Sequence, residues 1–290
     1  MVADLHAFSG QRKFLEPYIR HVVALSIASG IDTSKSTILL QSNFPEILEL
    51  HWILSSFISP ERLCKLSQFR NRTLDVKNKN ISTMLYPLLM ASDILLFKAC
   101  HVIAGPDQII HLNLTRKIAK VLNNAIGSDL MQLPELLSFD TFRVKSLSDG
   151  NSKMSKSDGC IMNRISMLDS DDVIHRKVKA AKTETQSENG QHSPEVTNLL
   201  NIYSFFSNKT TEQILSEHSS TQLSLMKEKM AEAVIDRLKP IRDKYFEIIE
   251  DKNYLHNILK LGRERLKPSV SLVLNELKYL LGHFGTKCPR

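Results

Sequence analysis

The chain has 290 residues, 42% of them hydrophobic and 24% charged, which is the balance of a globular protein with a sizeable core. No stretch approaches the roughly 20 uncharged apolar residues that a membrane-spanning helix needs, which argues against a membrane span. Lys and Arg outnumber Asp and Glu by 38 to 31, and the resulting charge of +7 is compatible with a polyanionic partner such as RNA but is weak evidence for one.

The cysteines and histidines point away from a metal or disulfide framework. The four cysteines lie far apart and form no Cys-x-x-Cys pair, which favours a reducing compartment. The ten histidines show no metal-ligand spacing, so no metal site is expected. The first ten residues resemble neither a secretory signal nor an arginine-rich transit peptide.

The first half of the chain alternates between helical and strand patterns. Apolar residues over 11–29 share one helical face, and Gly30 is a plausible cap at its end. The β-branched run at 37–41, "TILLQ", predicts a buried parallel strand. The stretch after it predicts a helix with Pro45 in the first turn, and Trp52 on that helix is interpreted as a core residue.

The alternation continues with a helix over 83–97, a short strand over 101–105 and a helix over 107–123. This order predicts an α/β fold with a Rossmann-like, doubly wound parallel sheet, which binds ligands beyond the carboxyl ends of its strands. Beyond Gly159 only helical patterns remain, at 171–183, 195–206, 221–250 and 253–283. We therefore expect an incomplete Rossmann-like α/β domain over 1–145, a loop over 146–160 and an all-helical domain over 161–290.

The loop holds the pentapeptide Lys-Met-Ser-Lys-Ser at 153–157, between Gly150 and Gly159. A lysine-rich loop is usually a solvated turn. This loop, however, lies where the α/β pattern ends, and its ammonium and hydroxyl groups suit phosphate. A lysine on such a loop can bind a triphosphate more strongly as charge develops on the departing pyrophosphate, and that difference accelerates a reaction.

A single carboxylate interrupts the apolar helix "YPLLMASDILLF" at 86–97. Asp93 lies three or four positions from Leu89, Met90, Leu96 and Phe97, so it shares their inward-facing stripe. A buried carboxylate is costly unless it is paired. Asp93 is therefore either a paired structural residue or the acceptor for a ligand N–H or O–H, with Met90 as an apolar wall.

The segment "HVIAGPDQIIHLNLTR" at 101–116 places Gly105 at the end of a strand and Asp107 and Gln108 at the start of a helix. Backbone N–H groups at such a helix start face the ligand crevice. The alternative is an ordinary strand-to-helix turn capped by Asp107, with His111 and Arg116 facing solvent.

These segments resemble the tryptophanyl-tRNA synthetases of the bacterial and organellar type, which are class I aminoacyl-tRNA synthetases. The pentapeptide at 153–157 matches the second class I signature. The resemblance covers nearly the whole chain and includes these segments: "ADLHA" (3–7), "LLQSNFPE" (39–46), "YPLLMASDILL" (86–96), "GPDQIIHLNLTR" (105–116) and "VKSLSDGNSKMSKSD" (144–158).

The resemblance implies roles for individual residues. Asp93 would accept the indole N–H of tryptophan, Met90 would line the ring pocket, and Gln108 would hold the polar end of the substrate. The ATP-binding set would be Gly105, Pro106, Asp107, Val144, Lys153, Met154, Ser155, Lys156 and Ser157, with Lys153, Ser155 and Lys156 as the catalytic members.

The family implies a homodimer that activates tryptophan with ATP and Mg²⁺ and then esterifies tRNA(Trp), whose anticodon the helical domain would read. The family's first signature, a Gly-Pro turn and an Ile-Gly-His/Asn motif, is absent from residues 1–30, and the first strand of the sheet with it. We expect an incomplete gene model, and we expect the chain as written to activate no tryptophan unaided. Pro106 and Ala104 also depart from the family's pattern.

Two alternatives stay open, a tyrosine–tRNA ligase and a non-catalytic, tRNA-binding or dimerising fragment. The segments at 143–150 and 233–248 look closest to animal mitochondrial members. The mitochondrial matrix is therefore the expected compartment, with the cytoplasm as the alternative.

Overall fold

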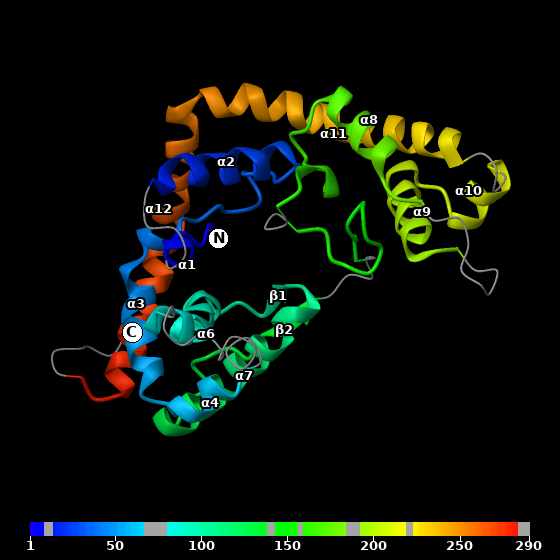
Figure 1. The fold of residues 1–290 in the computed structure, drawn as a ribbon. Helices are drawn as coiled ribbons and strands as arrows, with labels where there is room; N and C mark the ends of the chain where they lie inside the picture. Colours follow the sequence, from blue (N-terminus) through cyan, green and yellow to red (C-terminus); the bar gives the residue numbers. More distant parts are fainter. Residues whose placement is uncertain are drawn as a thin grey trace. The chain divides into compact units, whose positions relative to one another are not determined.

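A computed structural model describes residues 1–8, 14–66, 80–137, 143–155, 159–183, 192–218 and 223–283, without the side chain of Pro106. The chain divides into two compact units (Figure 1). Unit 1 joins Met1–Phe139 to Asp251–Arg290, and unit 2 is Asp140–Glu250. The expected helical domain over 161–290 thus differs from the observed division, because the helix at Lys252–Leu280 packs with the N-terminal part of the chain.

Unit 1 contains two parallel strands within a helical frame. The helices are α1 (Asp4–Phe8), α2 (Leu15–Ala28), α3 (Pro45–Ser55), α4 (Pro60–Cys64), α6 (Ile81–Leu95), α7 (Ile109–Ile126) and α12 (Lys252–Leu280). Two short 3₁₀ helices, η1 (Gln41–Asn43) and η3 (Pro106–Gln108), follow extended segments. The strands are β1 (His101–Ile103) and β2 (Glu135–Leu137), which pair in parallel from His101–Glu135 to Ile103–Leu137.

Strand β1, helix α7 and strand β2 form a parallel β–α–β unit, the building block of the predicted fold. The predicted helices at 83–97 and 107–123 and the strand at 101–105 are confirmed within a few residues. The predicted strand at 37–41 is reduced to one parallel bridge between Val2 and Leu40. Of the residues before α1, Val2 alone lies in this bridge, because α1 begins at Asp4.

The core of unit 1 lies between α3, α6, α7 and the second half of α12. It contains Leu50, Leu88, Leu122, Val270 and Leu277, all at most 1% exposed. Although α12 follows α11 directly in sequence, the apolar face of its second half is buried in the core of unit 1. This burial explains why α12 belongs to unit 1.

Trp52 is not a core residue, contrary to the sequence interpretation. The buried residues of α3 are Ile47, Leu50, Ile53 and Leu54. Trp52 lies on the opposite side of this helix and is 76% exposed. Because α3 is apolar on nearly all sides, its sequence pattern did not reveal which side faces the core.

Unit 2 is helical in its described part. Its helices are η4 (Ile161–Asn163), α8 (Asp171–Ala180), α9 (Pro194–Ser207), α10 (Thr211–Glu217) and α11 (Leu223–Glu250). Its core joins α8, α9 and α11 through Ile174, Leu199, Met230 and Val234. The helical periodicity predicted at 171–183, 195–206 and 221–250 is confirmed, and α10 is an additional element.

Local signals fix several helix ends. Gly30 follows Ser29, the C-cap residue of α2, and adopts φ 105°, which confirms the predicted glycine at this helix end. Ser193 caps α9, with its Oγ accepting a hydrogen bond from Val196 N at 3.3 Å, and Thr210 and Gln213 form a capping box on α10. Asp251 caps α12 by accepting a hydrogen bond from Tyr254 N at 2.9 Å.

Candidate active site

The carboxylate of Asp93 lies in a polar cluster in unit 1. Gln41 Nε2 donates to both carboxylate oxygens, each at 2.8 Å, and His6 Nδ1 lies 3.8 Å from Oδ2. Gln41 itself is fully buried, and its Oε1 accepts a hydrogen bond from Leu5 N at 3.1 Å. The side chain of Asp93 keeps 14% of its surface exposed, so the carboxylate can still be reached.

These partners come from the carboxyl ends of two parallel extended segments. Val2 bridges Leu40, so α1 with His6 and η1 with Gln41 leave the bridge in the same direction. Helix α6 brings Asp93 to the same place. The sequence reasoning missed Gln41 and His6 as partners. The available signal was the position of Gln41 at the end of the predicted strand at 37–41, where ligands and their supporting residues gather.

Burial raises the pKa of Asp93 from 3.8 to about 6, and the hydrogen bond from Gln41 and the charge of His6 oppose this effect. A shift of this size corresponds to about 3 kcal/mol spent on holding the charge in the fold. That cost is present above pH 6 and is relieved as the pH falls from 6 towards 3.8. Asp93 is therefore still mostly ionised at pH 7 and acts there as a hydrogen-bond acceptor.

The cluster extends along α6 to α7. His6 Nε2 lies 3.4 Å from the carbonyl oxygen of Tyr86, and the Tyr86 hydroxyl makes a short hydrogen bond with His111 Nε2. His111 is only 1% exposed, so the alternative in which it faces solvent is wrong. The rings of Tyr86 and His111 also pack in an edge-to-face arrangement, with their centroids 5.1 Å apart. Met90 is half-buried, one turn before Asp93.

The turn between β1 and α7 is compact. Gln108 N donates to Gly105 O at 2.9 Å, and the side chain of Gln108 donates to Asp107 Oδ2 at 2.8 Å. A Cβ on Gly105 would lie 2.7 Å from Asp107 Oδ1, so a glycine lets this carboxylate fold back over the turn. Asp107 is exposed, and Gln108 rather than Asp107 occupies the cap position of α7.

In unit 2, Val144 and the first residues of the pentapeptide lie on two paired stretches of chain. Lys145 bridges Lys153 in antiparallel fashion, Met154 N donates to Val144 O at 3.2 Å, and Ser146 N donates to Ser152 O at 2.9 Å. Val144 and Lys153 are exposed, whereas Met154 packs against the core of unit 2. Arg164 donates to Ser155 O at 3.5 Å. Lys156 and Ser157 lie outside the described residues.

Helix α9 anchors this loop. Asn198, which is 3% exposed, accepts a hydrogen bond from Lys145 N at 2.9 Å and donates to Lys145 O at 3.0 Å. Gly150 N donates to Glu195 Oε1 at 3.2 Å. A Cβ on Gly150 would meet the backbone of Pro194 at 2.2 Å, so the close packing of this loop on α9 requires a glycine here.

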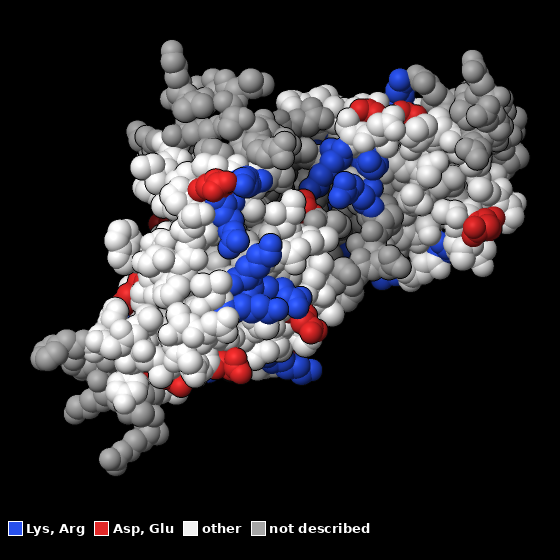
Figure 2. Space-filling model, turned by 90° about the horizontal axis from the view of Figure 1, so that it is seen from below, with Lys and Arg blue, Asp and Glu red and all other residues white. Residues whose placement is uncertain are grey.

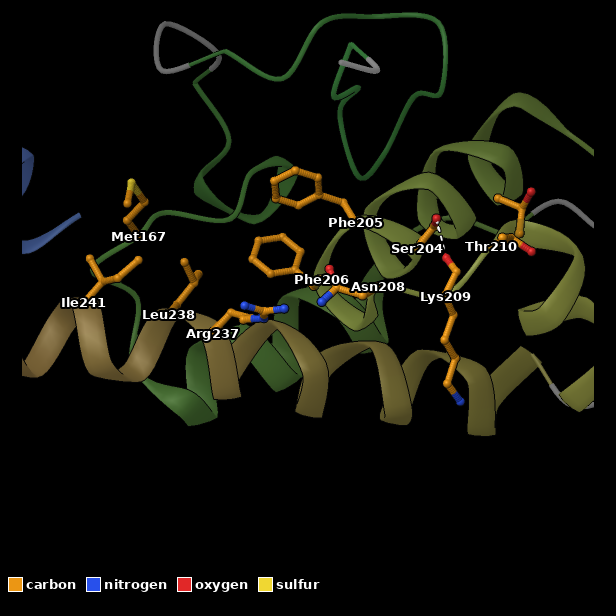
Figure 3. A pocket seen from close by; sticks show the side chains of 11 residues that line it. Met167, Ser204, Phe205, Phe206, Asn208, Lys209, Thr210, Arg237, Leu238 and Ile241 are labelled. Atoms are coloured by element: carbon orange, nitrogen blue, oxygen red, sulfur yellow. Dashed lines mark hydrogen bonds between the residues drawn. The ribbon is translucent and has the colours of Figure 1, made fainter. Parts of the chain in front are cut away.

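The predicted residues thus form two groups. Asp93, Met90, Gly105, Asp107 and Gln108 belong to unit 1, and Val144 and Lys153 to Ser155 belong to unit 2. A cavity of about 1010 Å³ in unit 2 contains none of them (Figure 3). It is lined by Met167, Phe205, Phe206, Arg237, Leu238 and others, and at its edge Ser204 Oγ donates to Lys209 O at 2.6 Å.

No three His, Cys, Asp or Glu side chains among the described residues gather as metal ligands. None of the described helices has an apolar stretch long enough to cross a lipid bilayer.

Comparison with known proteins places this architecture. A tryptophan–tRNA ligase of Rickettsia conorii is 40% identical over 288 residues, which span 97% of this chain and 87% of that protein. A tryptophan–tRNA ligase of a Nostoc species is 36% identical with the same coverage. The crystal structure of the Campylobacter jejuni tryptophanyl-tRNA synthetase, in complex with ADP and tryptophan, superposes with a TM-score of 0.81 at 26% identity over 97% of this chain and 88% of that one.

The family model described as "tRNA synthetases class I (W and Y)" matches residues 1–239. This match extends through β1, α7, the loop at 144–155 and most of α11, so it includes both groups of candidate site residues. The chain belongs to the class I tRNA synthetases of the tryptophan and tyrosine group.

Proposed function

We propose that the protein is a tryptophan–tRNA ligase that activates tryptophan with ATP and transfers it to tRNA(Trp). The observation that carries this proposal is the paired but reachable carboxylate of Asp93 beside Met90 on α6. The tryptophan–tRNA ligases of Rickettsia and Nostoc, which match nearly the whole chain, support the same choice.

The selectivity for tryptophan follows from the chemistry of Asp93. An ionised carboxylate accepts a hydrogen bond from the indole N–H, and a ligand without that N–H leaves a buried charge without its partner. Loss of a hydrogen bond to a charged group costs about 1.5–3 kcal/mol. The two N–H···O bonds from Gln41 hold the carboxylate in a fixed orientation, so it needs little rearrangement when the substrate binds.

The reaction has two steps. The carboxylate of tryptophan attacks the α-phosphorus of ATP, forming tryptophanyl-adenylate and releasing pyrophosphate. A ribose hydroxyl at the 3′ end of the tRNA then attacks the carbonyl carbon, forming the ester and releasing AMP. Mg²⁺ belongs to the ATP substrate as the counter-ion of its triphosphate.

The residues of the two groups divide this work in the proposal. The backbone at Gly105 and Asp107, at the start of α7, contacts the nucleotide, and Gln108 contacts the polar end of tryptophan. Lys153, Ser155 and Lys156 contact the phosphates and stabilise the charge that develops on the leaving pyrophosphate. Val144 lies against the adenine, and Met154 belongs to the loop that closes on the phosphates. We also propose a homodimer, as the family implies.

The test is amino-acid-dependent exchange of pyrophosphate into ATP, followed by charging of tRNA(Trp). The assay is run on the 290-residue chain and on the full translation product of its gene. Comparison of the two also tests the expectation that the 290-residue chain alone is inactive. Tryptophan-dependent exchange supports the proposal, and tyrosine-dependent exchange replaces it with the tyrosine ligase. Binding of tRNA by a full gene product that exchanges with neither amino acid leaves the non-catalytic alternative.

The compartment is a separate proposal. We propose the mitochondrial matrix, because the segments at 143–150 and 233–248 resemble animal mitochondrial members. The relatives compared above are bacterial, so these segments alone support it. Cell fractionation with an antibody against the chain distinguishes the matrix from the cytoplasm.

A further inference from the structure

The first half of α12 carries a line of exposed basic side chains. Lys252, His256, Lys260, Arg263 and Lys267 follow one another at spacings of four, four, three and four residues, and all five are exposed. These spacings place side chains on one face of a helix. At 1.5 Å per residue this basic stripe is about 22 Å long.

The cations of the basic stripe lack acidic partners. In the described part of the chain, none of its five side chains forms an ion pair, and Glu264, one turn after Lys260, forms none with it. The other two cations of α12 do have partners in unit 1. Lys278 pairs with Glu49 at 2.7 Å, and Arg265 donates to Thr37 Oγ1 at 3.1 Å.

An unpaired stripe is unfavourable for the helix that carries it. Like charges three or four residues apart, as in Lys260, Arg263 and Lys267, destabilise the helix that carries them. On α11, by contrast, Lys229 pairs with Glu232 at 2.8 Å. A basic stripe of this kind is therefore better explained by an anionic partner than by the stability of α12.

The net charge of the chain belongs to the unit that carries the stripe. Unit 1 has 22 Lys and Arg against 14 Asp and Glu, whereas unit 2 has 16 against 17. On the face drawn in Figure 2, Lys and Arg side chains gather in groups, with only a few acidic side chains beside them. The net positive charge of the chain thus resides in unit 1.

We propose that the basic stripe of α12 binds the sugar–phosphate backbone of the tRNA. This inference rests on the proposed function, which supplies the polyanion. Duplex nucleic acid in the B form carries about one phosphate charge per 1.7 Å of axis, so a stem laid across 22 Å of helix presents several phosphates. The contacts are independent of base sequence and contribute affinity and position.

The same helix is poorly suited to an anionic membrane surface. An interfacial helix needs an apolar face to insert between lipids. In the first half of α12, Leu255 is buried and Leu259 and Leu266 are half-buried. Tyr254 and Leu261 are exposed, but they lie on the side of the helix opposite the stripe, so one membrane surface cannot contact both. The stripe also ends at Lys267, immediately before Pro268, and beyond it Val270 and Leu274 enter the core of unit 1.

The test replaces three cations of the stripe with glutamine, in the variant K260Q/R263Q/K267Q of the full gene product. Binding of tRNA(Trp) is measured from 50 to 200 mM salt. Each lost phosphate contact lowers the slope of log affinity against log salt by about 0.7–0.9, so we expect the slope to fall by about 2. Affinity at the lowest salt should fall about tenfold or more, and tryptophan-dependent pyrophosphate exchange, which needs no tRNA, should not change.

The matched control is K229Q/K239Q/K244Q, which removes three exposed cations from α11 and the same net charge. It should alter the salt slope by less than half as much. Equal losses in both variants would overturn the proposal in favour of a general charge effect, and an unchanged slope in the stripe variant would overturn it outright. Thermal unfolding of each variant confirms that it is folded.

Two further outcomes separate this proposal from others. If the stripe variant keeps its RNA affinity but loses binding to phosphatidylserine vesicles, a membrane surface replaces RNA as the partner. If the wild-type protein exchanges pyrophosphate with neither amino acid but its tRNA affinity depends on the stripe, the proposed function fails while the stripe assignment stands.

Discussion

Asp93 in unit 1 and Lys153 in unit 2 are charged side chains with central roles in the proposed reaction, and the protein holds them in opposite ways. Asp93 is mostly buried and is oriented by the side chains of Gln41 and His6. Lys153 is exposed, and the backbone pairing of residues 144–146 with 152–154 fixes only the start of its side chain.

The difference fits the two tasks. A group that discriminates between amino acids gains from a fixed position and low exposure to water, because an unmatched ligand is then penalised most. A group that follows charge as it develops on a leaving phosphate gains from freedom to move. Asp93 should therefore govern the choice of amino acid, and Lys153 the rate of the chemical step.

The largest expected effect is that of Asp93→Ala. Removal of the acceptor should lower kcat/KM for tryptophan about 100-fold, since a charged hydrogen bond contributes up to about 3 kcal/mol, which corresponds to a factor of about 150. The KM for ATP should change less than twofold in the same pyrophosphate-exchange assay. Asp32→Ala, which removes an exposed carboxylate far from Asp93 in the sequence, is the control. Equal losses for both substrates would mean that Asp93 is only structural.

Lys153→Ala should have the next largest effect. We expect kcat for pyrophosphate exchange to fall about 30-fold, a loss of about 2 kcal/mol of transition-state stabilisation, with little change in the dissociation constant for tryptophan. Lys229→Ala in the same unit is the control, because Lys229 pairs with Glu232 instead. A rise in the KM for ATP with no change in kcat would show that Lys153 binds the ground state only.

A smaller effect should appear as the pH is lowered. With a pKa of about 6, Asp93 is about nine-tenths ionised at pH 7 and about one-tenth ionised at pH 5, so kcat/KM for tryptophan should fall about tenfold between them. Asp93→Asn should start lower and show no such step. A wild-type profile that is flat over this range would contradict the assignment of this pKa to the binding acceptor.

The smallest expected effect is that of Trp52→Phe. An exposed side chain away from any buried contact contributes little, so the free energy of unfolding should change by less than about 0.5 kcal/mol. Leu50→Ala on the same helix is the contrast, because Leu50 is fully buried and its truncation should cost about 2–5 kcal/mol. Urea denaturation measures both.

The sequence predicted the bounds of the helices better than the way in which the helices pack together. Helices α6, α7, α9 and α11 begin and end within a few residues of the predicted positions, because their apolar periodicity and caps are local signals. The strand at 135–137 was not predicted, since three residues offer too short a pattern. The return of α12 to unit 1 depends on long-range burial, which no local pattern encodes.

The sequence predicted the candidate functional residues themselves. It did not predict the residues that hold them in place. Asp93 is conspicuous because a charge interrupts an apolar helix, and the pentapeptide at 153–157 is a distinctive motif. Gln41, His6 and Asn198 are ordinary polar residues in sequence, and only the fold gives them their partners. Residues that support a functional side chain in this way can be identified only from their contacts in the structure, because no sequence motif marks them.

The position of Trp52 on the outer side of α3 has a practical consequence for spectroscopy. It is the single tryptophan among 290 residues, and little in the fold depends on it. With phenylalanine at this position, the polypeptide would contain no indole, and any indole emission would come from the added amino acid. Its shift and intensity would then report directly on the surroundings of the bound ligand, including the ionisation of Asp93, without background from the protein.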